Sequence, residues 1–194
     1  MEKLTYKTIL VVSLIVFATK LAHGTAQGPE EVKQWFAKLP TLRQKVTDLH
    51  FFFYTTTVGA NPNDVLVAQS NVTAKSPTLF GAMAVMDGPV TIGPERNSSQ
   101  LGRFQGFYAL SSLDEISFTM LFNFVFTHGK YNGSSLSVVG YNPVYHEHRE
   151  MVIVGGSGLF RLARGILTIK TMWWNVTTKL GDTVIECDVM LLHY

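Results

Sequence analysis

The sequence has 194 residues, of which 46% are hydrophobic and 15% are charged. This composition supports one folded domain, or two very small ones, and it excludes a disordered chain. The formal charge is +2, but residues 1–24 carry three lysines and one glutamate, so the rest of the chain has no net charge. A neutral chain lacks the basic surface that nucleic acids or anionic membranes require, and neither is expected as a partner.

The N-terminal 24 residues have the pattern of a secretory signal peptide. Lys3 and Lys7 precede an apolar run from Ile9 to Ala18, and residues 22–24 fit a small-x-small cleavage site. The run is shorter than the roughly 20 apolar residues that cross a bilayer. We therefore expect residues 1–24 to be removed and the mature protein to be soluble and secreted, with an uncleaved anchor or a core strand as the alternatives.

Potential glycosylation sites support export independently. Four sequons of the form Asn-x-Ser/Thr begin at Asn71, Asn97, Asn132 and Asn175. The single cysteine, Cys187, excludes an internal disulfide and is expected to act as a small buried hydrophobic residue. The domain must then be held together by its core alone.

Residues 28–40 are predicted to form a short helix within an N-terminal extension that spans residues 25–45. Pro29 suits the first turn, and Pro40 ends the helix. Apolar side chains recur with helical spacing at Val32, Trp35, Phe36 and Leu39. Such a helix is expected to serve as a lid or an arm on the main domain.

From residue 46 onward the apolar pattern changes to the period of two that is typical of strands. In residues 117–126 one face carries Phe118, Met120, Phe122, Phe124 and Phe126. Similar runs span 50–57, 65–70, 80–86, 105–110, 136–141, 151–154, 166–172 and 184–192, with turns between them, one of which is placed at 87–89. Many short strands without intervening helices predict an all-β antiparallel sandwich or barrel. A small barrel can hold one ligand in its mouth, and a lining of aromatic side chains would suit a flat phenolic ligand.

No catalytic motif is complete, and the densest polar cluster is at residues 146–150. On a strand, His146, His148 and Glu150 would share one face and could bind a metal as in the cupins, although an exposed polar strand explains them as well. No metal or cofactor is therefore expected. Arg149 would point the other way, into a cavity, where it could hold a phenolate or a carboxylate. Asp87, at a strand end, is a natural partner for Arg149, although capping of the turn explains Asp87 equally well.

The chain resembles the plant dirigent family over residues 46–194. The resemblance is carried by residues 50–53, 85–91, 101–108, 142–144 and 149–165. It implies an eight-stranded antiparallel β-barrel in the plant apoplast that forms a dimer or, more commonly, a trimer. The lack of a cysteine pair is similar to the larger dirigent-like subgroup.

The resemblance also implies the function. Dirigent proteins have no redox centre; they orient phenoxy radicals made by a separate laccase or peroxidase so that coupling to lignan-type or other phenolic products is stereoselective. Some relatives act instead as lyases that close a ring by loss of water through a quinone methide. A third alternative is a non-catalytic, defence-related protein that binds aromatic compounds.

The family's site residues fall on specific positions of this sequence. The resemblance assigns catalytic roles to Arg149, Tyr108 and Asp87. We also expect Phe53 and Phe122, as aromatic lining, and the polar residues Thr55 and Asn142 to bind substrate. At Thr55 and Asn142 this chain departs from the family, which commonly has aspartates there. Neither residue carries a titrating proton near neutral pH, so we expect a cavity poor in acids and favour radical coupling over dehydration.

Overall fold

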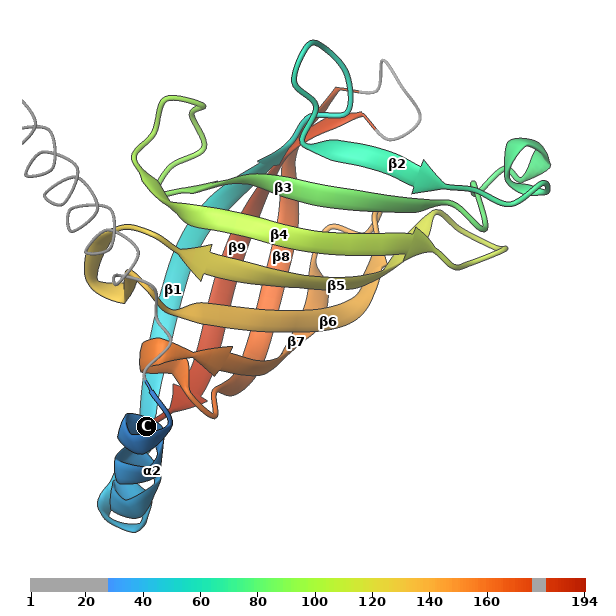
Figure 1. The fold of residues 1–194 in the computed structure, drawn as a ribbon. Coiled ribbons are helices and arrows are strands. Elements are labelled where there is room, and N and C mark those ends of the chain that lie inside the picture. The colour runs from blue at the N-terminus through green and yellow to red at the C-terminus, as the bar shows by residue number, and fades with distance from the viewer. Residues whose placement is uncertain (1–27, 176–180) are drawn as a thin grey trace, which may run out of the picture.

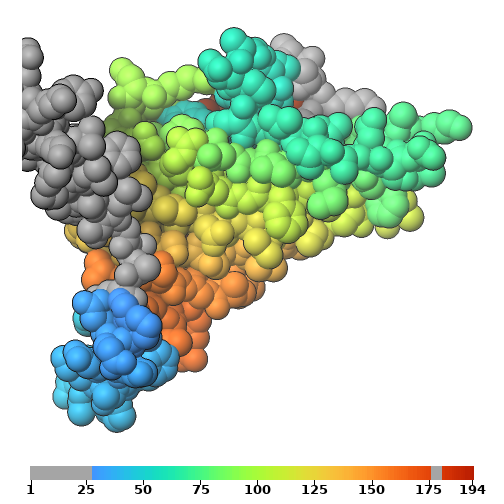
Figure 2. Space-filling view, in the orientation of Figure 1, coloured from blue at the N-terminus to red at the C-terminus, as the bar shows by residue number. Residues whose placement is uncertain are grey.

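The computed structural model describes residues 28–175 and 181–194, and the expected signal peptide lies outside these ranges. Helix α2 (Pro29–Lys38) and the 3-10 turn η1 (Leu39–Thr41) confirm the predicted helix. The Glu31 carboxylate accepts a hydrogen bond from the Gly28 amide and so caps the first turn. No α2 residue is buried, and the helix stands off the barrel as an arm rather than a lid (Figures 1 and 2). Within the described ranges, no helix is long and apolar enough to cross a membrane.

The remainder of the described chain is a meander of antiparallel strands. The strands are β1 (Lys45–Thr55), β2 (Asp64–Ala68), β3 (Met83–Thr91), β4 (Gln100–Leu110), β5 (Ser117–Phe126), β6 (Ser135–Pro143), β7 (Arg149–Ser157), β8 (Arg164–Asn175) and β9 (Asp182–His193). Short 3-10 turns η2 (Thr73–Lys75), η3 (Gly129–Tyr131) and η4 (Gly158–Phe160) lie in the connections.

The strands close into the predicted eight-stranded barrel. Each strand from β3 to β9 pairs with its sequence neighbour, β9 pairs with β1, and β1 pairs with β3 at Phe52–Thr91 and Phe53–Val90 (Figure 1). This last, short pairing completes a ring that omits β2. Strand β2 is therefore an additional strand that lies against β3 at the edge of the pairing order.

The barrel interior is packed with aromatic side chains along part of its length. Phe51 meets Phe124 edge-to-face with ring centroids 4.7 Å apart, and Phe53 lies 4.5 Å from Phe104. On β5, Phe122, Phe124 and Phe126 are almost fully buried in this core. The same strand continues toward Phe118, where the packing opens into a cavity.

The outside of the barrel carries a continuous row of apolar side chains, one from each of eight consecutive strands. Each member is 37–54% exposed and lies directly opposite the next in the strand register. This outer apolar row consists of Val65, Val85, Phe107, Leu121, Val139, Val152, Ile166 and Met190. Contiguous exposed apolar surface of this kind is typical of interaction sites.

Candidate functional site

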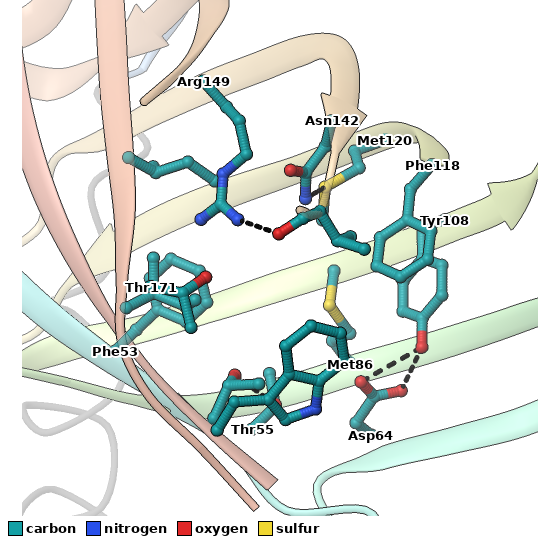
Figure 3. Close-up of a pocket in the computed structure, with 15 residues that line it drawn as sticks. Phe53, Thr55, Asp64, Met86, Tyr108, Phe118, Met120, Asn142, Arg149 and Thr171 are labelled. Carbon is teal, nitrogen blue, oxygen red and sulfur yellow. Dashed lines mark hydrogen bonds between the residues drawn. The ribbon is translucent and has the colours of Figure 1, made fainter. Parts of the chain in front are cut away.

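A cavity lies inside the barrel and receives side chains from every strand (Figure 3). Its walls are largely aromatic and aliphatic, with a few polar groups that point inward. The lining consists of Phe53, Thr55, Asp64, Met86, Tyr108, Phe118, Met120, Asn142, Val144, Arg149, Ile169, Thr171, Trp174, Thr183 and Ile185. A concave, mostly apolar space with convergent polar groups is the usual form of a small-molecule site.

One wall of the cavity holds a buried acid, Asp64, bound to Tyr108. The Tyr108 hydroxyl donates to both carboxylate oxygens, at 3.0 and 3.1 Å, and its ring stacks on Phe118 at 4.4 Å (Figure 3). Burial raises the pKa of the Asp64 carboxyl from 3.8 to about 6, although the hydrogen bond from Tyr108 opposes this effect. Burial and the neighbouring carboxylate raise the pKa of Tyr108, which stays a neutral donor. The pair can therefore hold a transferable proton under mildly acidic conditions.

The residue before the acid fixes its position. The Asn63 side chain donates to the Tyr54 carbonyl at 3.0 Å and accepts from the Thr56 amide at 2.6 Å, which ties the start of β2 to the end of β1. A Cβ atom at Gly88 would lie 2.7 Å from the Asn63 amide nitrogen and 2.4 Å from a ring atom of the neighbouring strand. Glycine is thus needed at position 88 to leave room for the Asn63 side chain, whose hydrogen bonds hold Asp64 in position.

Another part of the cavity wall presents unpaired polar groups of Arg149 and Asn142. Arg149 is 3% exposed and donates to the Val144 carbonyl at 2.8 Å, while its Nε and second terminal nitrogen have no partner in the described part of the chain. The Asn142 amide contacts the Met120 sulfur at 3.1 Å, and its Oδ1 likewise lacks a partner there (Figure 3). Burial lowers the pKa of Arg149. A ligand hydroxyl could accept from Arg149 and donate to Asn142, which would satisfy both groups.

The other predicted substrate-binding residues differ in their placement. Phe53 and Thr55 line the cavity, and the Thr55 hydroxyl bonds that of Thr183 at 2.7 Å. Phe122 does not line the cavity, because it faces the packed core, where it meets Phe124 edge-to-face at 5.3 Å. The alternation along β5 predicts that Phe122 is buried. Its position along the barrel axis depends instead on how β5 pairs with its neighbouring strands.

Asp87 lies on the outer surface, and the expected pairing with Arg149 is absent. Its carboxylate accepts from Arg103 Nε at 2.6 Å, and both side chains are about half exposed. The sequence pattern predicts a strand that ends at Met86 and a turn at Asp87, whereas β3 continues through Thr91. Side chains alternate along the strand, so Met86 faces inward and Asp87 faces outward.

The two histidines of the polar cluster also depart from their expected setting. They lie in the turn before β7, which begins at Arg149, and not on a strand. His146 is 3.3 Å from Glu115, and His148 is 3.6 Å from Glu147. In the ranges 28–175 and 181–194, no three metal-ligating side chains come together.

The sequons occupy different surroundings. Asn71, Asn97 and Asn132 are exposed in connecting segments, whereas Asn175 is partly buried at the end of β8. The third residue of that last sequon, Thr177, lies outside the described residues.

Two cavity residues that matter most for the chemistry, Asp64 and Trp174, are not among the site residues predicted from the sequence. The expectation of a cavity poor in acids did not include Asp64, a titrating carboxyl that β2 supplies. The available signal was an acidic residue directly before the predicted strand at 65–70, but its position after an Asn-Pro-Asn stretch is equally typical of a turn. Trp174 could not be placed, because its orientation depends on an irregularity in β8.

Comparison with known proteins gives consistent matches. The family model described as "Dirigent-like protein" matches residues 46–192. Dirigent protein 11 of Arabidopsis thaliana is 44% identical over 149 residues, which cover 77% of this chain and 75% of that protein. Pterocarpan synthase 1 of Glycine max is 41% identical over 160 residues, or 80% and 85% of the two chains. A solved structure of a pterocarpan synthase dirigent protein is 40% identical, has a TM-score of 0.71, and is matched over 77% of this chain and 96% of that chain.

Proposed function

The chain belongs to the dirigent family, and on that premise we propose that it is a dirigent-type lyase that removes water from a phenolic substrate and closes a ring. The observation that carries this proposal is the buried Asp64 carboxyl in the cavity, with a pKa of about 6. About nine tenths of such groups are protonated at pH 5, compared with about one tenth at pH 7. An ordinary aspartate would have lost its proton at both values.

The proposed step balances as follows. The substrate phenol loses its proton to solvent and lies as a phenolate toward Arg149, whose unpaired N–H groups stabilise the charge. Asp64 gives its proton to a benzylic hydroxyl, the C–O bond breaks, and water leaves. The electron pair of the phenolate moves through the ring and forms a quinone methide. A second hydroxyl of the substrate attacks the methide and returns a proton to Asp64, which leaves a phenolate product and the acid restored.

The similarity to two proteins named pterocarpan synthase, from Glycine max and Glycyrrhiza echinata, supports this choice within the family. Each name describes a synthase of a defined product, and both proteins are at least 40% identical to this chain over more than three quarters of its length. The substrate proposed here is a phenol with a benzylic hydroxyl and a second hydroxyl that can close a ring.

The test is product formation without an oxidant. The purified protein is incubated with a panel of such phenols, with and without laccase, and products are separated by chiral chromatography. We expect an oxidase-independent product that is lost in Asp64→Asn. The matched variant Asp87→Asn makes the same chemical change on the outer surface and should retain activity. Product that depends on laccase alone, or an active Asp64→Asn protein, would refute the lyase proposal.

Steering of radical coupling is the second candidate, and the largely apolar, aromatic walls of the cavity favour it. In this case the partners are phenoxy radicals and an external laccase or peroxidase, and orientation of the two radicals is the whole contribution of the protein. The same experiment identifies it by a changed enantiomer ratio only when laccase is present. If the experiment shows neither an oxidase-independent product nor a changed enantiomer ratio, the third alternative remains, namely a non-catalytic aromatic-binding protein.

We also propose that the protein is secreted and glycosylated, on the basis of the N-terminal pattern and the exposed sequons at Asn71, Asn97 and Asn132. A mass decrease after enzymatic deglycosylation of the protein from plant medium tests both points. The outer apolar row supports self-association as a dimer or trimer, because water would otherwise cover eight neighbouring apolar side chains.

A further inference from the structure

We propose that Trp174 is an aromatic platform that selects ligands with a flat, fully aromatic ring in this cavity. The inference rests on the proposed function in one respect, namely that the ligand is a phenol. It adds a specificity-determining residue, supplied by β8, to the polar groups already described.

An irregularity in β8 turns this side chain into the barrel. Leu167, Ile169 and Thr171 alternate inward, so a regular strand would place Trp173 inside and Trp174 outside. The register instead shifts between Thr171 and Trp173, which accommodates one additional residue. A bulge of this kind redirects the side chains that follow it, and bulges are frequent beside active sites.

The exposures on either side of the bulge agree with this change. Met172 and Trp173 both face outward and are 50% and 49% exposed. Trp174 lies directly opposite Thr183 on β9, and both line the cavity. Two adjacent tryptophans thus have opposite settings, one on the outer surface and one at the ligand space.

Tyr145 and Gly181 are neighbours of the indole of Trp174 and limit its position. Its ring stacks on Tyr145, with centroids 5.4 Å apart and an angle of 28° between the planes. A Cβ atom at Gly181, where φ is +63°, would lie 2.3 Å from the indole nitrogen, so a side chain there would displace the ring. Tyr145 itself is 66% exposed and does not line the cavity. The indole is therefore fixed by neighbours rather than by a ligand.

A fixed indole favours a particular ligand chemistry. An indole presents a large polarisable face, and offset stacking on an aromatic ring adds stabilisation beyond the area that is buried. A saturated ring of similar size buries comparable area but lacks this contribution. Trp174 is expected to discriminate between these rings, whereas the polar groups of Asp64 and Arg149 recognise hydroxyls and do not.

The experiment compares two phenols that differ only in the second ring, 2-naphthol and 5,6,7,8-tetrahydro-2-naphthol, by isothermal titration calorimetry. The wild-type protein should prefer 2-naphthol by roughly three- to tenfold. The preference should fall to nearly one in Trp174→Leu and largely persist in Trp174→Phe. Trp173→Leu makes the same substitution one residue earlier, on the outer surface, and should leave the preference unchanged.

A second measurement uses the unaltered protein, so it does not depend on the folding of a variant. Among the three tryptophans of the chain, Trp35, Trp173 and Trp174, only the indole N–H signal of Trp174 should shift strongly when 2-naphthol is added to protein labelled with 15N-tryptophan. An unshifted Trp174 signal, or an unchanged preference in Trp174→Leu, would overturn the inference.

The outcomes also separate this inference from the proposed function. A Trp174-dependent preference together with Asp64-independent turnover would uphold the platform and refute the lyase. Asp64-dependent turnover with no Trp174-dependent preference would uphold the lyase and refute the platform. No binding of either phenol would overturn the platform, whereas the lyase proposal would still be decided by product formation from phenols with a benzylic hydroxyl.

Discussion

Replacing Asp64 with asparagine should abolish turnover and at the same time stabilise the folded protein near neutral pH. The side chain is 7% exposed, and burial raises its pKa from 3.8 to about 6. The folded state therefore holds this proton more tightly than the unfolded chain does. The favourable contribution is fully present below pH 3.8 and is lost as the pH rises through about 6, where the buried group becomes charged.

The magnitude follows from the size of this change. At about 1.4 kcal/mol for each pH unit, the ionised Asp64 lowers the free energy of unfolding by roughly 3 kcal/mol above pH 7. Asparagine has nearly the same shape, can accept the hydrogen bond from Tyr108, and carries no charge. The variant should therefore match the wild type near pH 4 and exceed it by up to about 3 kcal/mol at pH 7.5, while turnover falls by roughly 10²–10⁴-fold.

Urea unfolding of both proteins at pH 4 and pH 7.5 measures the stability difference, and chiral product analysis measures turnover. Asp87→Asn is the control, because its carboxylate is half exposed and pairs with Arg103 at the surface, so the difference should stay below about 1 kcal/mol at both pH values. An Asp64→Asn protein less stable than the wild type at pH 7.5, or a difference independent of pH, would refute the assignment of Asp64 as a buried proton donor.

Three further predictions test the rest of the site and the surface. Tyr108→Phe removes the hydrogen bond that lowers the pKa of Asp64, so the alkaline limb of the pH–rate profile should move to higher pH; an unmoved limb would separate Tyr108 from the acid. Arg149→Met should keep or raise the melting temperature, because an unpaired buried charge is removed, while calorimetry shows at least a tenfold loss of affinity for 2-naphthol; unchanged affinity would exclude Arg149 from ligand binding. Ile166→Lys should interrupt the outer apolar row, and sedimentation velocity should show a shift toward monomer, whereas a monomeric wild type would remove the basis for this expectation.

The strong alternation of apolar residues predicted the positions of the strands well, whereas the choice of a closed barrel over a sandwich depended on the family resemblance. All nine predicted runs correspond to strands, and the run at 117–126 has the same bounds as β5. The errors lie at strand ends, where local signals compete. The Gly88-Pro89 pair suggested a turn after Met86, but the strand passes through it, and this error placed Asp87 on the wrong face.

The candidate site was only partly predictable. Arg149 and Tyr108 were assigned by resemblance, and both line the cavity. Asp64 was missed because nothing local reveals that β2 lies against β3 with its first residue turned inward. Trp174 was missed for a related reason, since the bulge in β8 is defined by its register with β9 and not by the local pattern of residues.

The closure of the ring by β1 and β3 has a consequence for how such proteins can diverge. Two residue pairs join these strands directly, so the ring is complete without β2, yet the proposed proton donor is carried on β2. A substitution at the first position of this accessory strand can add or delete acid chemistry without altering the scaffold or the aromatic ligand pocket. If the proposed role of Asp64 holds, radical steering and water elimination need no separate folds, because one position on an edge strand distinguishes them.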